Sequence, residues 1–354
     1  MADQIPVAVL AATGSVGQRF VQLLDGHPWF KVIALTGSSR AIGETYGQSC
    51  HWILKEPMPV WAEDIVVSPS SPEAFDARLV FSALPSEQAL EIEPQFARTG
   101  VFVCSNASAF RDEPDVPLLL PEVNPNHTGL LSTQRQNRGW EGGIVTNPNC
   151  TSTGMTVVLK ALQDAFGLKR AFVVSLQALS GAGYPGVASL DIVDNVIPYI
   201  GNEESKVELE PRKMLGSMQT DRINLAEVQI SAHTNRVAVS DGHIVCLSVE
   251  LNHPVAVEAA EQALSSYHPP EDSCDLPSTP HPVIRVRNEP DRPQPRLDRM
   301  TGNGMTTVVG RVRPDPLFHL KMVTLSHNTI RGAAGGSIYN SELLVKQGWL
   351  GAAV

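Results

Sequence analysis

Short apolar runs separated by amphipathic stretches dominate the first part of the chain. The run at 5–10 predicts a buried strand of a parallel sheet. A glycine-bearing turn follows it, and beyond the turn apolar residues recur at the spacing of one helix face. Similar runs predict strands at 31–35, 79–85, 101–104 and 144–146, with a helix at 88–97. Strands that alternate with helices are typical of a doubly wound α/β fold, so the sequence predicts an N-terminal Rossmann-type domain.

The hydrophobic pattern changes beyond residue 146. Longer segments there alternate partly between apolar and polar residues, as strands do when one face of their sheet meets solvent. These predicted strands are 171–179, 230–239, 242–250, 306–313 and 320–325. We therefore expect a second, α+β domain with a mixed, largely antiparallel sheet, and place the domain boundary between residues 146 and 147.

Two long segments lack clear periodicity and are predicted to be irregular. Residues 131–143 are polar and contain glycine, which indicates an excursion over the surface. Residues 269–299 are dense in proline, aspartate and arginine, which indicates a loop-rich segment.

The first turn is a candidate cofactor site. Its glycines allow a pyrophosphate to approach the backbone at a helix N-terminus, although a plain strand-to-helix turn is the alternative. An NAD site would usually carry an acidic residue after the second strand, whereas this strand runs into hydroxyls and an arginine, which suit a 2′-phosphate. The sequence therefore predicts NADP as the cofactor, with a solvated loop as the alternative for this segment. The candidate residues are Thr13, Gly14, Ser15, Val16, Gly17, Ser38, Ser39 and Arg40.

One cysteine lies in an unusual setting, within Asn-Pro-Asn-Cys-Thr-Ser-Thr-Gly at 147–154. The turn would deliver Cys150 to the start of a helix that the apolar spacing after it predicts. Unpaired N–H groups and the positive end of the helix dipole would favour the thiolate, and the same N–H groups could hold an oxyanion. The alternative is a small buried hydrophobe, but a purely packed position needs no such polar, turn-forming surround.

Further candidates lie where predicted strands begin or end. Ser82, Asn106 and Arg111 follow strands at the carboxyl edge of the first sheet, where such folds bind ligands. His243 begins a strand beside a turn, where its side chain can face a cleft. A surface role for Arg111 and a structural or solvated role for His243 are the alternatives. The loop at 180–186 is richer in glycine than packing alone requires.

Composition and charge narrow the class of protein. The chain has 354 residues, of which 42% are hydrophobic and 18% charged, which is ordinary for a globular protein of two domains. A net charge of −10 argues against nucleic acid as the main partner. Five cysteines without CxxC spacing suggest neither a disulfide framework nor a metal site. Reduced thiols, no signal-peptide pattern and no long apolar run favour a cytoplasmic protein.

Together these motifs resemble the aspartate-semialdehyde dehydrogenase family, almost from end to end. The matching elements are Ala-Thr-Gly-Ser-Val-Gly-Gln at 12–18, Asn-Pro-Asn-Cys-Thr at 147–151, Ser-Gly-Ala-Gly at 180–183, Arg236, Asp-Gly-His at 241–243 and Gly-Ala-Ala-Gly-Gly at 332–336. The arrangement is more similar to the archaeal and fungal branch than to the typical Gram-negative enzyme. Ala11 departs from the pattern, because the glycine turn often begins with Gly.

The resemblance implies reductive dephosphorylation of L-aspartyl 4-phosphate to L-aspartate 4-semialdehyde by NADPH, in the aspartate pathway to lysine, threonine, methionine and isoleucine. Cys150 would form the thioester, His243 would act as general acid and base, and Gln177 would orient the acyl group. Arg236 would bind the substrate carboxylate, and Glu203, with Glu204 as the alternative, its ammonium. The implied phosphate ligands are Arg111, Lys206 and Asn106. Further implied cofactor contacts are Ser82, Ser180, Gly181, Gly183 and Asn340.

The resemblance also bears on domain organisation and partners. Residues 329–354 are expected to rejoin the N-terminal domain formed by 1–146, leaving 147–328 as the catalytic and dimerisation domain. A homodimer or homotetramer is expected if the second sheet has an apolar free face. The expected partners are otherwise the substrate and inorganic phosphate, without a membrane.

Four other classes of protein share parts of this sequence pattern. N-acetyl-glutamyl-phosphate reductase and malonyl-CoA reductase have a similar plan, but the Glu203 to Lys206 segment favours a phosphorylated substrate with a free amino group. Glyceraldehyde-3-phosphate dehydrogenase usually has an acidic residue after the second strand, and this chain has none there. A catalytically inactive NADP-binding sensor should have lost Cys150 or His243, and both are present.

Overall fold

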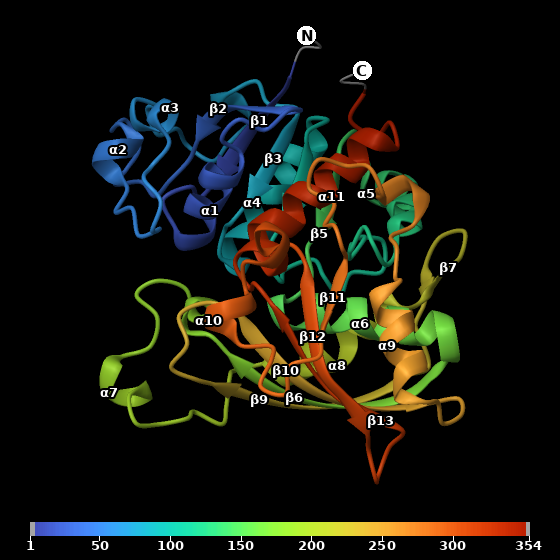
Figure 1. The fold of residues 1–354 in the computed structure, drawn as a ribbon. Coiled ribbons are helices and arrows are strands. Elements are labelled where there is room, and N and C mark those ends of the chain that lie inside the picture. Colours follow the sequence, from blue (N-terminus) through green and yellow to red (C-terminus); the bar gives the residue numbers. More distant parts are fainter. Residues whose placement is uncertain (1–3, 352–354) are drawn as a thin grey trace.

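A five-stranded parallel sheet forms the centre of the N-terminal domain in the computed structural model, which describes residues 4–351 (Figure 1). Its strand order is β2-β1-β3-β4-β5, and every neighbouring pair is parallel. The strands are β1 (Ile5–Leu10), β2 (Phe30–Leu35), β3 (Leu79–Ser82), β4 (Phe102–Ser105) and β5 (Gly143–Thr146). The predicted Rossmann-type architecture is therefore confirmed.

Helices cover both faces of this sheet because each strand is apolar on both sides. Val7 and Val9 belong to one buried cluster, whereas Ala8 and Leu10 belong to another. Alternate residues of β1 thus face opposite layers. The helices of this domain are α1 (Ser15–Leu23), α2 (Tyr46–Ser49), α3 (Val60–Glu63), α4 (Ser86–Arg98) and α5 (Leu130–Arg138), with short 3-10 turns η1 (Pro72–Ala74) and η2 (Pro125–Gly129).

The C-terminal helix α11 (Gly335–Lys346) lies beside the first sheet (Figure 1). It contacts β4, and its Ile338 and Leu344 share a buried cluster with Phe20 and Phe81. The C-terminal helix therefore packs against elements of the N-terminal sheet.

The expectation of an irregular excursion at 131–143 is wrong. Residues 131–138 belong to the nine-residue helix α5, which ends at Gly139 in the left-handed conformation. The helix is mostly polar and buries little besides Leu130, Leu131 and Gln134. Its apolar stripe is therefore too short to produce a clear helical period.

The second sheet has six strands in the order β11-β12-β13-β10-β6-β9. Three neighbouring pairs are antiparallel, whereas β11 pairs with β12, and β6 with β9, in parallel. This confirms the mixed, largely antiparallel sheet. The strands are β6 (Leu168–Gln177), β9 (Gln229–Arg236), β10 (His243–Leu251), β11 (Ile284–Arg287), β12 (Thr307–Pro314) and β13 (Leu320–Ser326), with a separate hairpin of β7 (Ser217–Met218) and β8 (Ile223–Asn224).

Two details of the second domain were not predicted from the sequence. The segment at 269–299 contributes β11 as well as loops. The strands joined by the turn at 240–242 do not pair with each other, because β6 lies between them. That arrangement brings the end of β6, the end of β9 and the start of β10 together at one edge of the sheet.

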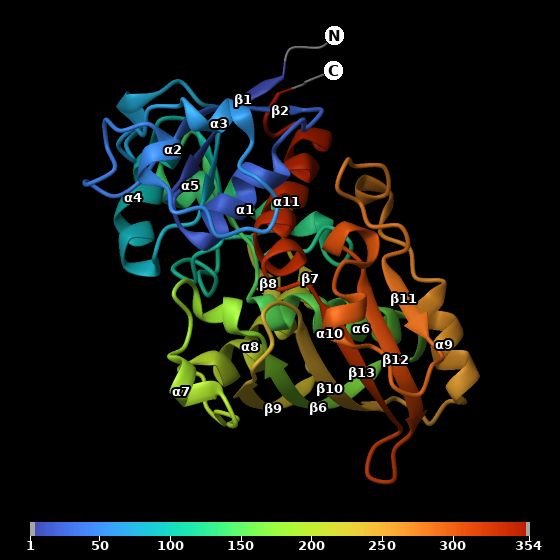
Figure 2. The same ribbon diagram turned by 60° about the vertical axis from the view of Figure 1, so that its left-hand side comes forward.

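Helices cover the face of the second sheet that is turned toward the N-terminal domain (Figure 2). Met155, Val158 and Leu162 of α6 pack in one cluster with Val173 and Val245 of the sheet. The helical segments are α6 (Cys150–Phe166), α7 (Ser189–Ile192), α8 (Glu203–Met214), α9 (Val257–Ser265) and α10 (Pro295–Asp298), the 3-10 turns η3 (Leu179–Ala182), η4 (Glu271–Ser273) and η5 (Thr301–Gly304), and the π-helical turn η6 (Ile330–Ala334).

Candidate active site

Cys150 is the first residue of α6, directly after the turn that follows β5. The Asn149 side chain caps this helix: its Oδ1 accepts the backbone N–H groups of Thr151 at 2.9 Å and Ser152 at 3.2 Å. An asparagine cap satisfies donors that the helix leaves unpaired. The predicted start of the helix at the cysteine is thus confirmed, but two of its first N–H groups are not available to an oxyanion.

His243 lies against the sulfur, with Nε2 3.2 Å from Sγ of Cys150. The backbone N–H of Ala178 donates to Nδ1 of the same ring at 3.1 Å. Because Nδ1 accepts this bond, a neutral imidazole carries its proton on Nε2, facing the sulfur. The geometry makes His243 a hydrogen-bond donor toward the reacting atoms.

The surroundings of Cys150 act against the thiolate that the start of the helix is expected to favour. Burial raises the pKa of the Cys150 thiol to about 12, and the Glu203 carboxylate adds to the rise, while Arg111 and Arg236 oppose it. Burial also lowers the pKa of His243 to about 3. Desolvation thus disfavours both the thiolate of Cys150 and the imidazolium of His243.

Arg236 comes from the end of β9 and is buried beside the histidine. Its Nη1 donates to the carbonyl oxygen of Ala178 at 2.7 Å. Gly181 passes so close that an added Cβ would lie 2.7 Å from Nη1 of Arg236 and 3.1 Å from Nε2 of His243. Only glycine leaves both side chains in place, which explains part of the glycine content of this loop.

Glu203 and Lys206 lie on α8, and Glu203 contacts Asn149, the cap of the nucleophile's helix. Oε1 of Glu203 accepts from Asn149 Nδ2 at 2.8 Å and from Gln177 Nε2 at 3.1 Å, and Lys206 Nζ lies 3.9 Å from Glu203 Oε2. Glu204 instead accepts the backbone N–H of Thr234 in β9. The structure therefore brings Glu203, not Glu204, together with the cysteine motif.

Arg111 is buried in the same region. Its Nη1 donates to Oε1 of Glu210 at 3.0 Å and its Nη2 to the carbonyl oxygen of Asn106 at 2.7 Å. Within the described residues, Arg111 Nε and Asn106 Oδ1 are buried without a hydrogen-bond partner. Buried polar atoms usually have partners, so these two mark a place where a polar ligand fits.

Glu210 is the site residue that the sequence reasoning missed. It is buried, and Oε2 accepts the backbone N–H of Asn149 at 2.6 Å. A signal was present, since Glu203, Lys206 and Glu210 are spaced three and four residues apart, which places them on one helix face.

The glycine turn leaves the start of α1 open. Gly14 is its N-cap, no side chain caps it, and its first turn contains no acidic residue. A cavity of about 310 Å³ opens there and is shared with the second domain. It is lined by Thr13, Gly14, Ser15, Val16, Gly17, Gln18, His51, Ile53, Ala83, Gly183 and Tyr184. An uncapped helix start facing a cavity suits a pyrophosphate.

The remaining predicted cofactor residues differ in their surroundings. Both amide atoms of Asn340 are buried, and neither has a partner among the described residues. Ser180 accepts a hydrogen bond from Asn328 Nδ2 at 2.8 Å. The prediction for Ser82 needs correction. Ser82 is fully buried and its hydroxyl accepts the N–H of Leu84, so the hydroxyl does not reach a cavity. Ser38, Ser39 and Arg40 are exposed after β2.

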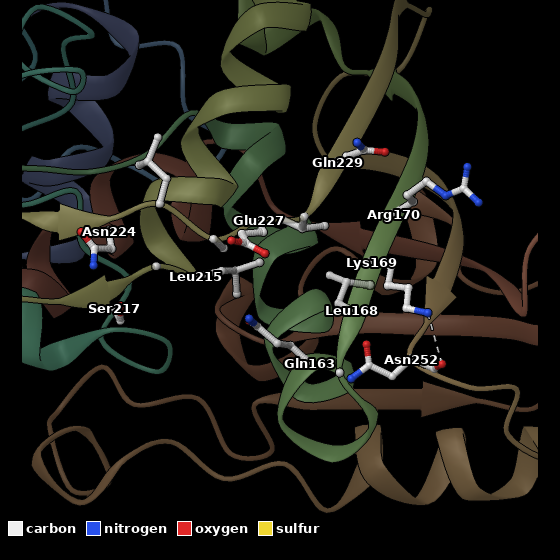
Figure 3. Close-up of a pocket in the computed structure, with 15 residues that line it drawn as sticks. Gln163, Leu168, Lys169, Arg170, Leu215, Ser217, Asn224, Glu227, Gln229 and Asn252 are labelled. Atoms are coloured by element: carbon white, nitrogen blue, oxygen red, sulfur yellow. Dashed lines mark hydrogen bonds between the residues drawn. The ribbon is translucent and has the colours of Figure 1, made fainter.

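Another cavity, of about 890 Å³, lies between the end of α6, the start of β6 and the β7–β8 hairpin (Figure 3). Lys169, Arg170, Glu227, Gln229 and Asn252 are among its lining residues, and none of the predicted site residues lines it.

Within residues 4–351, no group of three or more His, Cys, Asp or Glu is placed to hold a metal ion, and no helix is both long and apolar enough to cross a membrane.

Comparisons with known proteins identify the family of this chain. The semialdehyde dehydrogenase NAD-binding domain matches residues 6–130, and the semialdehyde dehydrogenase dimerisation domain matches residues 159–331. The aspartate-semialdehyde dehydrogenase of Archaeoglobus fulgidus is 53% identical over 96% of this chain and 98% of its own. That of Saccharomyces cerevisiae is 42% identical over 98% of this chain and 99% of its own.

The crystal structure of the Candida albicans enzyme with NADP superimposes with a TM-score of 0.90 at 40% identity, covering 98% of this chain and all of that one. The chain therefore belongs to the aspartate-semialdehyde dehydrogenase family, whose members reduce L-aspartyl 4-phosphate to L-aspartate 4-semialdehyde with NADPH.

Proposed function

We propose that this chain carries out the reaction of its family with Cys150 as the nucleophile and His243 as the acid. The observation that carries the proposal is the 3.2 Å contact between Cys150 Sγ and His243 Nε2 at the start of α6. Nucleophile and acid–base groups within hydrogen-bond reach are the arrangement that covalent catalysis requires.

In the first half of the reaction, Cys150 attacks the acyl carbon of the substrate, the bond to the phosphate oxygen breaks and a thioester forms. The thiol must lose its proton on attack, since burial keeps its pKa high. His243 Nε2 already carries a proton when the ring is neutral, so the phosphate, whose second pKa is about 6, is the base that removes it.

In the second half, bound NADPH supplies the hydride that reduces the thioester. His243 donates a hydrogen bond from Nε2 to the charge that then develops on the substrate oxygen and on the departing sulfur. The sulfur leaves as a thiolate when the aldehyde carbonyl forms, and one proton taken up from solvent restores the thiol. Cys150 N–H, which makes no hydrogen bond within residues 4–351, is the remaining donor at the helix start.

Three charged groups of the substrate have matching partners in the site. Arg236 is assigned to the α-carboxylate, since a guanidinium binds a carboxylate with two parallel bonds. Glu203 is assigned to the ammonium, supported by its position beside the cap of the nucleophile. Gln177 orients the acyl group. The phosphate ligands are Arg111, Lys206 and Asn106.

The residues around α1 fit the NADP that the family uses. We assign the pyrophosphate to the open N–H groups of the turn, the 2′-phosphate to the exposed hydroxyls and guanidinium after β2, and the nicotinamide end to Asn340 and the glycine loop. Unpartnered amide atoms of Asn340 support the last assignment. The cofactor residues are Thr13, Gly14, Ser15, Val16, Gly17, Ser38, Ser39, Arg40, Ser180, Gly181, Gly183 and Asn340.

The family's dimerisation domain makes this chain part of an oligomer. We propose a homodimer or homotetramer, with 1–146 plus 329–354 as the cofactor domain and 147–328 as the catalytic and dimerisation domain. A cytoplasmic location is also proposed, because all five cysteines are free thiols and the nucleophile must stay reduced.

The test is NADP-dependent oxidation of L-aspartate 4-semialdehyde with and without inorganic phosphate. We expect phosphate-dependent activity in the wild type, its loss in Cys150→Ala and its retention in Cys274→Ala, a thiol outside the site. Activity that persists in Cys150→Ala would exclude the thioester. Activity that does not need phosphate would exclude acyl-phosphate chemistry.

A further inference from the structure

One face of α8 carries four charged residues, spaced three and four positions apart: Glu203, Lys206, Glu210 and Lys213. Three of them are buried and Lys206 is partly exposed. Residues at this spacing lie above one another on a helix, so the whole row faces the same neighbours. The proposed function uses the first two and leaves Glu210 and Lys213 without a role.

Glu210 joins two parts of the site that are far apart in the sequence. One carboxylate oxygen accepts from Nη1 of Arg111 at 3.0 Å, and the other accepts the backbone N–H of Asn149 at 2.6 Å. Arg111 belongs to the proposed phosphate site, and Asn149 directly precedes the nucleophile. Both partners are donors, and each of the two carboxylate oxygens of Glu210 accepts from one of them.

Lys213 fixes the backbone of the same arginine. Its Nζ donates to the carbonyl oxygens of Arg111 at 2.7 Å, Glu113 at 2.7 Å and Val116 at 2.9 Å. The α8 face thus holds Arg111 by its main chain through Lys213 and by its side chain through Glu210. The Asn106 carbonyl holds the other terminal nitrogen of the guanidinium.

We propose that Glu210 is a positioning residue of the phosphate site, whose carboxylate fixes the Arg111 guanidinium at a set distance from the peptide preceding Cys150. Phosphate then meets a guanidinium that is already oriented, with its buried Nε free of protein partners among the described residues. Preorganised donors bind without a further ordering cost. Glu210 acts through Arg111, since both of its oxygens are already occupied.

The charge balance of the site supports this role. Burial raises the pKa of Glu210, while Arg111 and the Asn149 N–H act against that rise. The carboxylate is thus tied to its two partners, and removal of either one would leave a buried polar group unpaired.

The experiment compares Glu210→Gln with the matched control Glu208→Gln on the same helix. Glutamine at 210 offers one acceptor and one donor group. Its amide nitrogen must therefore face either the Arg111 guanidinium or the Asn149 N–H, both of which are donors. Among residues 4–351, Glu208 accepts only the backbone N–H of Ala232, through one oxygen, and glutamine can keep that bond. Steady-state kinetics in the oxidative direction give KM for phosphate and KM for L-aspartate 4-semialdehyde separately.

We expect Glu210→Gln to raise KM for phosphate by about tenfold or more, corresponding to ~1.4 kcal/mol, with KM for the aldehyde changed less than about threefold. Glu208→Gln should leave both unchanged. A purely structural role would raise both constants together or leave them alone, and either result overturns the proposal. A lower KM for phosphate would also overturn it, since the carboxylate would then be a competitor of phosphate for Arg111.

Glu210→Asp keeps the charge but is too short to bridge both partners, so it should show the same phosphate-specific change if the glutamine variant does not fold. The coupling is tested in an Arg111→Gln background, where Glu210→Gln should add less than about twofold to KM for phosphate. An additive effect would mean that Glu210 does not act through Arg111. The inference rests on the proposed function, which fails separately if the wild type shows no phosphate-dependent activity.

Discussion

Two helices of the molecule begin at the site, and they begin differently. The N-cap of α1 is Gly14, which offers no side chain, whereas the N-cap of α6 is Asn149, whose Oδ1 accepts two backbone N–H groups. The first opens onto a cavity, and the second carries Cys150. Both positions lie at the end of a parallel strand, so the difference comes from the cap residue and from what surrounds it.

The difference shows two uses of a helix N-terminus. At α1 the unpaired N–H groups remain available to an anionic ligand, which the family's cofactor provides. At α6 the protein satisfies most of these groups itself and uses the cap to hold the nucleophile in place. The helix dipole therefore does not act alone: at α1 it favours binding of an anion, whereas at α6 the protein around Cys150 raises the pKa of the thiol.

The largest expected effect is a loss of stability at α1, where the helix backbone passes close to the turn before it. An added Cβ at Gly17 would lie 2.3 Å from the carbonyl oxygen of Ala11, whereas one at Gly14 would lie 3.5 Å from that oxygen. Gly17→Ala should therefore lower the free energy of unfolding by about 3 kcal/mol, as overpacking does. Gly14→Ala should lower it by less than about 1 kcal/mol. Urea denaturation measures both, and equal losses would show that α1 can shift away from β1.

Alkylation of Cys150 by iodoacetamide tests the protonation state at α6. With the pKa raised to about 12, the thiolate fraction, and hence the rate, should rise with pH. The expected increase is about tenfold for each pH unit from 7 to 10. A thiolate stabilised by the helix dipole would instead give a rate that levels off near neutrality. The Cys150→Ala variant corrects for modification of the other thiols.

The smallest expected effect concerns the cap of α6. Asn149→Ala removes the oxygen that accepts from Thr151 and Ser152, and should lower the free energy of unfolding by about 1 kcal/mol relative to Asn149→Ser. Serine keeps a cap oxygen but, like alanine, loses the bond to Glu203, so the difference isolates the cap. Thermal and urea unfolding of both variants measure it. No difference between them would mean that tertiary packing alone fixes the start of α6.

Local sequence features were sufficient to predict the two helix starts. Residues 5–17 and 144–154 each combine an apolar strand, a turn with its required residues and a helix, and these preferences act over a few neighbouring residues. The resemblance added the roles of Arg236 and Glu203, and the structure brings both beside the cysteine motif. The helix α5 was missed because its buried stripe is too short to give a period.

Only the tertiary structure decided the electrostatic state of the site. The protein packed around Cys150, which is half-buried, raises the pKa of its thiol, and sequence does not reveal how closely it packs. Glu210 meets Arg111 across 99 positions of the chain, so no local pattern links them. Ser82 ends its strand as predicted but is covered by neighbouring elements. Short-range preferences therefore determined where the elements begin, whereas burial and contacts between distant segments determined which groups are charged, paired or accessible.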